Sequence, residues 1–472
     1  MVTDGGKACV ARPEAGAIHP DRIALGGDQA GGPIAFLYPA FPVLHQTFVM
    51  WEALALRRGG LKLKLYSLQR PPKGKQQPEA ESLAREVEYL PHALSPSVLA
   101  ANMRCMWRRP RNYLRGVFQL LRHWYADSKE LRRSRKNAAR SKRSLAWSVR
   151  FEAWWNTSPT VYLLKSLSLL PQAIYLGERL TAERIRHLHA HWATHATTVA
   201  LFLRWVYGIR FSFTAHAYDI YLMPLLLPAK LEAADLVVTC AQVNAEYLQG
   251  LAKAKTPRIV VNYHGVDLQR FRPRPRPRFG TTPCIVSCGS LRVYKGHHVL
   301  IEACALLPYP VRCIIIGEGP QRPILEKQVR ELGLAESVVF TGAIVQEQVA
   351  EHYAQADLFV LASVLVEESG RQDVIPNVLV EAMAMGIPVV ASDLPGIREL
   401  ITDRVHGRLV PPENPRALAD TVAELLADPV QRAELAERGR TRVVEAFDRE
   451  RNVRALVAEL VSLRGLEPHH GP

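Results

Sequence analysis

Short apolar runs alternate with amphipathic stretches between residues 33 and 267. PIAFLYPAFP at 33–42 is bounded by prolines and predicts a buried strand, and TFVMWEALALRRGG at 47–60 predicts a helix with a Gly-Gly stop. LKLKLYSL at 61–68 alternates as a strand does. Further along, residues 187–221 predict a strand, a helix and a strand, and two more strands follow in 234–241 and 258–267. This order predicts a parallel sheet with right-handed crossovers.

The second half repeats this alternation after a proline-rich break. RFRPRPRPRFGTTP at 270–283 has no periodicity, and alternating Arg-Pro is typical of a stiff extended linker, which places a domain boundary near residues 270–282. From residue 284 to residue 412, short apolar strands alternate with helices of about ten residues, the pattern of a doubly wound sheet. Residues 429–465 predict two terminal helices.

The predicted fold class is therefore α/β, with two Rossmann-like doubly wound domains that face each other across a cleft. We expect a poorly ordered leader at 1–30, a first domain at 31–272, a second domain at 280–443 and a terminal helix at 444–463 that packs back toward the first domain. Ligands of open parallel sheets bind beyond the carboxyl ends of the strands. A cleft between two such sheets can hold one substrate on each side.

The composition of the 472 residues, 48% hydrophobic and 22% charged, is typical of globular domains. Seven scattered cysteines show no metal-finger spacing, which favours buried thiols in a reducing compartment such as the cytosol. No apolar run reaches the roughly 18 residues that a transmembrane helix needs. The N-terminus has acids and glycines before any apolar run, unlike a signal peptide.

Most of the net charge of +15 lies in one segment, which we treat as a basic insert at about 101–155. Residues 101–150 contain twelve Arg and three Lys against only Asp127 and Glu130. Aromatic residues are interleaved with these charges, a combination that suits an anionic membrane surface. A solvated helical surface or a disordered insert stays open as an alternative. Nucleic acid is not expected as a partner, because no nucleic-acid-binding motif accompanies the charge.

A pair of acids eight residues apart is the strongest local signal of chemistry. In DVIPNVLVEAMAMG, Asp373 precedes a predicted helix start, and Glu381 is the only charge between Val378 and Met385. A lone carboxylate on a buried helix must be hydrogen-bonded or bind a ligand. Ribose hydroxyls would suit it, and the helix N-terminus would suit a diphosphate. A buried acid that caps nearby backbone is an equally valid interpretation of these residues alone.

EAMAMGIPVVASDLPGIREL at 381–400 resembles the EAMA.G.PVVAS…GI.EL motif of family 4 glycosyltransferases, retaining enzymes of the GT-B fold. The likeness is greatest to those of exopolysaccharide and colanic acid biosynthesis. In that family two acids, often both Glu, lie eight residues apart. The resemblance implies that Asp373 contacts donor sugar hydroxyls and that Glu381 binds the donor ribose. It also implies that the sugar or diphosphate faces the backbone of Ile375, Pro376, Asn377 and Val378.

CGSLRVYKGHHVLIEA at 288–303 is similar to the family segment GRL…KG…LIEA, in which an Arg and a Lys hold the diphosphate. After the turn at Gly289, Lys295 matches the family lysine, but Ser290 replaces the arginine. Arg292, two residues away, is the candidate substitute. The resemblance further places Gly317 and Gly319 beneath the nucleotide and the backbone of Ile344 and Val345 beside the base.

Histidines mark the first half of the chain. His187, His189, His191 and His195 have metal-like spacing, so a metal site is an alternative on chemistry alone. However, HAHWA at 189–193 resembles the family's HAHFA, which is not a metal site. TAHAYDIY at 214–221 resembles its T.H..D, which implies that His216 lies beside the donor sugar and the acceptor. By the same likenesses His191 and Asp219 would lie on the acceptor side. YPAFPVLHQTFV at 38–49 resembles the P.LSETFI..E loop of exopolysaccharide and colanic-acid-type transferases, which implies that Thr47 and Glu52 flank the acceptor side.

The resemblance implies a retaining transfer of a hexose from a nucleoside diphosphate sugar to a hydroxyl of a saccharide acceptor, and the family likeness together with the basic insert favours a lipid-linked one. Asp373, Glu381, Lys295 and His216 are the expected catalytic residues, and no metal or other cofactor is expected. We predict a cytoplasmic protein held peripherally at the inner face of the membrane. Two alternatives stay open: a GT-B sugar-nucleotide epimerase, and a non-catalytic relative that acts as a membrane-surface scaffold. The departure at Ser290 is what keeps the second alternative open.

Overall fold

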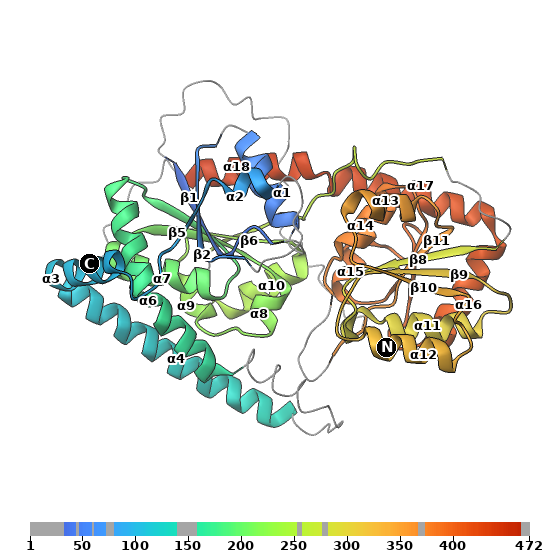
Figure 1. Cartoon of the computed structure of the whole chain (residues 1–472), viewed down its shortest axis with the longest axis horizontal. Coiled ribbons are helices and arrows are strands. Elements are labelled where there is room, and N and C mark those ends of the chain that lie inside the picture. Colours follow the sequence, from blue (N-terminus) through green and yellow to red (C-terminus); the bar gives the residue numbers. More distant parts are fainter. Residues whose placement is uncertain are drawn as a thin grey trace, which may run out of the picture.

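A computed structural model of the chain describes residues 33–43, 47–58, 61–71, 80–138, 158–252, 257–275, 282–366 and 373–463. Two β-sheets, each covered by helices, lie side by side along the longest axis of the molecule (Figure 1). All pairings between neighbouring strands in both sheets are parallel. The predicted pair of doubly wound α/β domains is therefore confirmed. The predicted leader at 1–30 lies outside the described residues.

The first domain contains a seven-stranded sheet with the order β3-β2-β1-β4-β5-β6-β7. Its strands, in sheet order, are Val87–Tyr89, Leu63–Gln69, Ile34–Ala40, His187–His191, Arg210–Ala215, Leu236–Thr239 and Arg258–Val261. Its helices are α1 (Thr47–Arg58), α2 (Ala80–Ala84), α3 (Pro96–Arg108), α4 (Pro110–Ala138), α6 (Pro159–Ala182), α7 (His195–Tyr207), α8 (Ala217–Tyr221), α9 (Leu227–Ala233) and α10 (Gln242–Leu251).

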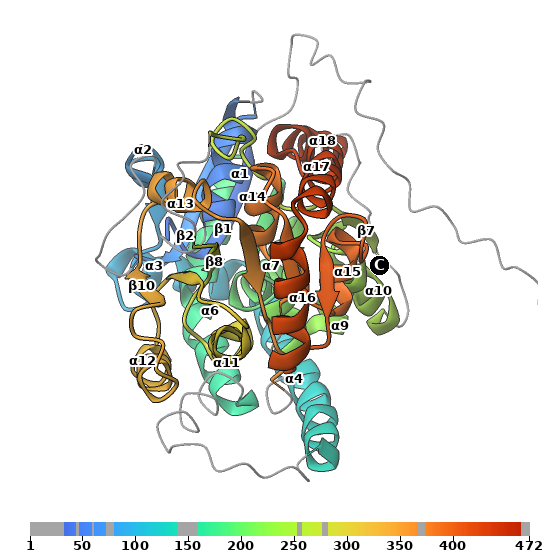
Figure 2. The same ribbon diagram turned by 90° about the vertical axis from the view of Figure 1, so that its right-hand side faces the viewer.

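The second domain contains a six-stranded sheet with the order β10-β9-β8-β11-β12-β13. Its strands, in sheet order, are Val338–Gly342, Arg312–Ile316, Cys284–Cys288, Leu358–Leu361, Val389–Ser392 and Arg408–Val410. Its helices are α11 (His297–Leu306), α12 (Arg322–Glu331), α13 (Gln346–Tyr353), α14 (Asn377–Ala384), α15 (Pro395–Leu400), α16 (Pro415–Ala427) and α17 (Pro429–Ala446). The helices flank the sheet on both faces (Figure 2).

The apolar runs form strands because both faces of each sheet are covered. In the first sheet Phe36, Phe211 and Phe213 are completely buried, and in the second Ile285 and Phe359 are. Strands that are buried on both faces need near-continuous apolar sequence rather than strict alternation. This requirement explains why the short apolar runs in the sequence predicted the positions of the strands.

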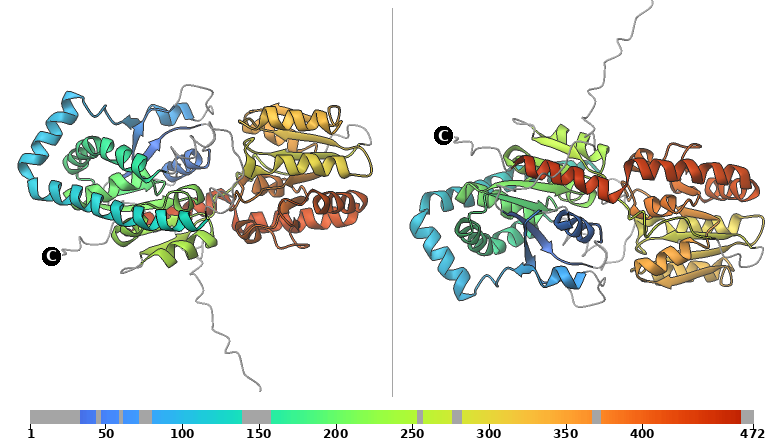
Figure 3. Two further views of the ribbon diagram at one scale, coloured as in Figure 1. Left: turned by 90° about the horizontal axis from the view of Figure 1, so that it is seen from below. Right: turned by 90° about the horizontal axis from the view of Figure 1, so that it is seen from above.

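The terminal helix α18 (Arg449–Ser462) crosses back to the first domain, as the view from above shows (Figure 3, right). Val453, Leu456 and Leu460 of this helix pack into the same apolar cluster as Phe36 and Val49. The crossing lies beside the chain that enters the second domain: the amide of Val266 donates to the carbonyl of Phe447 at 2.8 Å. A Cβ at Gly265 would lie 2.0 Å from the Cα of Arg449, so the two crossings are in close contact.

The segment predicted as a basic insert begins as two helices. α3 and α4 pack on the first domain, and α4 is the long helix along the lower edge of Figure 1. Residues 139–157 lie outside the described part of the chain. Among the helices of the described residues, none is long and apolar enough to cross a membrane.

Candidate functional site

Lys295 and Asp373 form an ion pair at the carboxyl edge of the second sheet. Lys295 Nζ lies 2.8 Å from Oδ1 and 2.9 Å from Oδ2 of Asp373, and the Ser363 hydroxyl donates to Oδ2 at 2.6 Å. The three residues follow β8, follow β11 and precede α14, so separate segments meet here. Burial, the largest single effect, lowers the pKa of Lys295, but the Asp373 carboxylate, with smaller contributions from Tyr294 and Cys288, outweighs it and the pKa is raised. The ammonium therefore stays charged at neutral pH.

Two glycines hold the loop that carries Lys295. Gly296 has a φ of +65°, and a Cβ at this position would lie 1.6 Å from the carbonyl oxygen of Ala362. Gly317, which follows β9, has a φ of +144°, and its Cβ would lie 1.9 Å from the carbonyl oxygen of Gly289. A side chain at either position would separate the loops. These contacts fix the Lys295 loop next to the segment that bears Ser363.

Glu381 lies one turn into α14 and is half-buried. Its Oε1 accepts from the Gln346 amide at 3.4 Å, and Arg270 donates to Gln346 Oε1 at 2.8 Å. Burial raises the pKa of Glu381 to about 8, although the nearby Arg270 guanidinium lowers it in part. The protein alone therefore stabilises the carboxylate incompletely. A ligand that donates hydroxyl hydrogen bonds would favour the ionised form.

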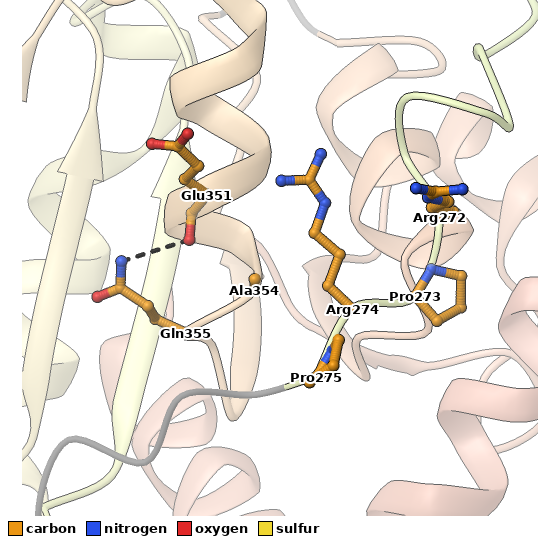
Figure 4. Close-up of a pocket in the computed structure, with 7 residues that line it drawn as sticks. All are labelled: Arg272, Pro273, Arg274, Pro275, Glu351, Ala354 and Gln355. Atoms are coloured by element: carbon orange, nitrogen blue, oxygen red, sulfur yellow. Dashed lines mark hydrogen bonds between the residues drawn. The ribbon is translucent and has the colours of Figure 1, made fainter.

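Glu381 lines a cavity between the two domains. Residues of both domains line it, among them Trp51, His264, Gln346, Asn377, Glu381 and Arg449. A second cavity lies along the linker, between Arg272–Pro275 and the end of α13, where Gln355 donates to the carbonyl of Glu351 (Figure 4). None of the predicted site residues lines this second cavity, so we place no site there.

Histidines gather at the carboxyl edge of the first sheet. His191, at the end of β4, donates through Nε2 to Glu52 Oε1 at 2.8 Å. His216, directly after β5, lies with Nδ1 3.2 Å from Nε2 of His264. Burial, reinforced by His264, lowers the pKa of His216 well below its usual range, and burial lowers that of His264 to about 4. Both imidazoles are therefore neutral at neutral pH and can accept or donate one hydrogen bond at each nitrogen.

A buried pair, Asp219 and Lys230, shapes the loops around His216. The Asp219 carboxylate accepts from the backbone amides of His216, at 2.7 Å, and of Ala193. Lys230 Nζ donates to the carbonyl of Ala193 at 2.6 Å. Burial raises the pKa of Asp219 and lowers that of Lys230, each to about 7, and each group opposes the shift of the other. Asp219 is fully buried, and its carboxylate fixes the backbone at His216.

Trp192 is held in a left-handed conformation beside His216. Its φ is +72°, and its ring centroid lies 4.3 Å from that of His216. The Trp192 amide donates to the carbonyl of Thr214 at 2.9 Å, and the Thr197 hydroxyl donates to the carbonyl of Trp192 at 2.7 Å. Strained backbone of this kind persists where the surroundings fix it, and it clusters at functional sites.

Two groups of side chains in the described residues could hold a metal ion: Glu52 with His189 and His191, and His216 with Cys240 and His264. The structure does not gather the four histidines of the sequence motif around one point. In the first group, both His189 nitrogens already hydrogen-bond, to Ser212 at 2.8 Å and to Thr214 at 2.9 Å. Those hydroxyls account for His189 without a metal.

Two glycosyltransferase family models match consecutive parts of the chain. Residues 134–270 match the family described as Glycosyltransferase Family 4, and residues 269–442 match Glycosyl transferases group 1. The chain is 29% identical over 442 residues to WcaL of Escherichia coli, named as a colanic acid biosynthesis glycosyltransferase, which covers 91% of this chain and 98% of that protein. The chain is a glycosyltransferase.

Other known proteins match this glycosyltransferase over a shorter stretch or at lower sequence identity. It is 34% identical over 171 residues to the amylovoran biosynthesis glycosyltransferase AmsK of Erwinia amylovora, a match that covers 36% of this chain and 42% of that protein. The crystal structure of Anabaena HepE with UDP-glucose superimposes with a TM-score of 0.62 at 19% identity, over 91% of this chain and 99% of that one. At that identity the superposition supports the GT-B fold alone.

The other predicted residues of the glycosyltransferase lie around these contacts. The Ser290 hydroxyl lies 3.4 Å from the Tyr294 hydroxyl, and a Cβ at Gly319 would lie 2.5 Å from the carbonyl of Leu291. The remaining donor-side residues stand on the loop after β8, before α13 and at the start of α14: Arg292, Ile344, Val345, Ile375, Pro376, Asn377 and Val378. Thr47 begins α1, but its side chain lies outside the described residues.

Four residues at or near the site were not predicted from the sequence: Arg270, Ser363, His264 and Lys230. Arg270 was hidden in the Arg-Pro linker, and Ser363 and His264 become notable only through contacts with residues far away in sequence. Lys230 had a usable signal, since it is the only charge in the apolar run from Leu225 to Leu231. The argument that singled out Glu381 applies to it equally.

The raised pKa of Glu381 predicts a pH-dependent stability. The native state keeps a proton that the unfolded state loses above its ordinary pKa of about 4.3, so the stabilisation falls as pH rises toward about 8. Between pH of about 5 and about 8.5, the free energy of unfolding of wild type should fall by about 4 kcal/mol relative to that of Glu381→Gln, since one pKa unit corresponds to about 1.4 kcal/mol. Urea unfolding of both proteins measures this difference. Parallel pH profiles would contradict the assigned environment of Glu381.

Proposed function

We propose that the enzyme transfers a hexose, with retention of anomeric configuration, from a nucleoside diphosphate sugar to a hydroxyl of a saccharide acceptor. The observation that carries the proposal is the Lys295–Asp373 pair next to the N-terminus of α14, with Glu381 one turn into the helix. A fixed cation next to a helix N-terminus suits a diphosphate. A half-buried carboxylate suits ribose hydroxyls.

The names of the relatives support this donor and this biosynthetic role. WcaL is named for colanic acid biosynthesis and AmsK for amylovoran biosynthesis, both polysaccharides. HepE, which shares the fold, was crystallised with UDP-glucose. We therefore propose a role in exopolysaccharide or cell-envelope glycan synthesis.

The proposed reaction breaks the bond between the sugar C1 and the diphosphate oxygen and forms the bond between C1 and the acceptor oxygen on the same face. The leaving diphosphate takes the acceptor proton. Lys295 and the positive end of α14 stabilise the negative charge that develops on the leaving group. Neutral His216, fixed by Asp219 through its backbone, orients the reacting hydroxyl. Asp373 orients Lys295 and contacts the sugar hydroxyls.

We propose a lipid-linked saccharide as the acceptor and the inner face of the membrane as the place of reaction. The basic charge of residues 101–155 favours an anionic lipid surface over a neutral one. Such an arrangement would place the first domain, on the acceptor side, next to the lipid that carries the acceptor.

Chelation of divalent metals is expected to leave transfer within about twofold of its original rate, because Lys295 and the helix dipole supply the charge that Mg²⁺ supplies elsewhere. The measurement compares sugar transfer with EDTA and with added Mg²⁺ or Mn²⁺. A strict requirement for either metal would contradict the metal-free mechanism.

A panel of nucleoside diphosphate sugars tests the function itself. Release of nucleoside diphosphate is measured with and without a crude lipid-linked saccharide fraction as acceptor. We expect acceptor-stimulated release from one donor. Conversion of the donor sugar without an acceptor would identify an epimerase. Nucleotide binding without any turnover would identify a non-catalytic scaffold, the outcome that Ser290 in place of the family arginine favours.

A further inference from the structure

Helix α4 has two apolar stripes, of which only one is buried. Tyr113, Val117, Leu120 and Trp124 face the core of the first domain. The helix is pressed closely against α7, since a Cβ at Gly116 would lie 3.0 Å from the Phe202 ring. These contacts fix the rotation of α4 about its axis, so they also fix which side chains point outward.

The outward stripe of α4 consists of Leu114, Phe118, Leu121 and Tyr125, at a spacing of four, three and four residues. α3 presents a similar stripe, with Leu99, Met103, Met106 and Trp107 exposed. Trp107 is 81% exposed and Phe118 is 65% exposed. We call these eight residues the α3–α4 ridge. Soluble domains rarely leave so many large apolar side chains together in water, so a ridge of this kind marks an interaction surface.

Basic side chains flank the ridge. Arg108, Arg111, Arg115 and Arg122 are exposed, and within the part of the chain that the structure describes none of them has an acidic partner. In the view from below, α4 lies across the outside of the first domain (Figure 3, left). An apolar stripe with guanidinium groups beside it matches the boundary between the acyl chains and phosphates of an anionic bilayer.

We propose that the α3–α4 ridge inserts into the interfacial region of an anionic membrane, with the flanking arginines on lipid phosphates. A second copy of the chain fits less well, because a symmetric contact would bring the same arginines of both copies together. This membrane contact rests on the proposed function only for its purpose, which is to reach a lipid-linked acceptor. Insertion of the ridge differs from simple charge attraction, because binding by inserted apolar side chains resists salt whereas electrostatic attraction to the surface does not.

Vesicle partition of the full chain tests the ridge. The vesicles contain either phosphatidylglycerol with phosphatidylcholine or phosphatidylcholine alone, at about 0.1 M and about 0.5 M salt. Wild type should bind the anionic vesicles and keep a measurable part of that binding at the higher salt. The double variant Trp107→Ser/Phe118→Ser should lose about tenfold or more in partition at both salt concentrations. Both side chains are exposed, so the fold should tolerate the change.

Two matched variants complete the experiment. Ile324→Ser removes an apolar side chain that is 58% exposed on α12 and should partition as wild type does. Arg111→Gln/Arg115→Gln/Arg122→Gln should lose binding mainly at low salt. Wild-type partition by the ridge variant would overturn the proposal, as would complete release of wild type by salt. Light scattering that finds a dimer dissolved by Trp107→Ser/Phe118→Ser, without vesicle binding, would assign the ridge to a second copy.

The vesicle experiment and the donor assay can fail independently of each other. Nucleoside diphosphate release measured without vesicles should be equal in wild type and the ridge variant, because neither residue touches the donor site. No release from wild type in the donor panel would remove the proposed function while vesicle partition still decided the ridge.

Discussion

Replacement of Glu381 by alanine is expected to reduce sugar transfer by at least about 100-fold while the protein stays folded. The carboxylate is the proposed acceptor for the donor ribose hydroxyls, and alanine leaves those hydroxyls unpaired in an interdomain cavity. Alanine should not lower stability at neutral pH, because burial raises the pKa of Glu381 to about 8 and the charged form of this side chain does not stabilise the fold. Steady-state kinetics and thermal unfolding measure the two effects.

Glu381→Gln is the matched control, since the amide keeps the shape and one acceptor oxygen. Its activity should lie between those of wild type and Glu381→Ala. Neither variant should have a Tm more than about 4 °C below that of wild type. Near-normal transfer by Glu381→Ala would overturn the assignment of this residue to the donor.

Replacement of Lys295 by alanine is expected to lower kcat/KM by about 100-fold or more, because no other described cation is in hydrogen-bond contact with Asp373 at the mouth of α14. It should also destabilise the protein by about 2–3 kcal/mol, since among the described residues the Ser363 hydroxyl would then be the one remaining side-chain partner of the Asp373 carboxyl group. Kinetics and urea unfolding report the two consequences separately.

The double variant Lys295→Ala/Asp373→Ala separates charge pairing from catalysis. Removal of both partners should recover much of the lost stability, because no unpaired carboxylate remains. Transfer should stay low. Recovery of activity in the double variant would mean that Lys295 serves only to neutralise Asp373.

Local sequence pattern was sufficient to predict the architecture. Strands such as β1 and β8 are short apolar runs bounded by proline, glycine or a turn, and doubly wound sheets bury both faces of such runs. The same logic identified Glu381, whose single charge interrupts an apolar helix. The two terminal helices were also predicted, and the structure has them as α17 and α18.

Contacts between distant segments could not be predicted in this way. Lys295 and Asp373 are 78 residues apart, and their direct pairing depends on how the loops after β8 and before α14 meet. His264 reaches His216 from a strand two places further along the sheet. The α3–α4 ridge was hidden for a different reason: one of two apolar stripes stays exposed, and a sequence does not reveal which stripe a helix buries.

A crystal structure of the protein with the nucleoside diphosphate selected by the donor panel would show which residues hold the donor. We expect Lys295 Nζ within hydrogen-bond distance of a phosphate oxygen and Glu381 on the ribose hydroxyls, with the nucleotide against the second domain. A nucleotide bound elsewhere, or bound with Lys295 and Glu381 both turned away from it, would overturn the proposed donor site.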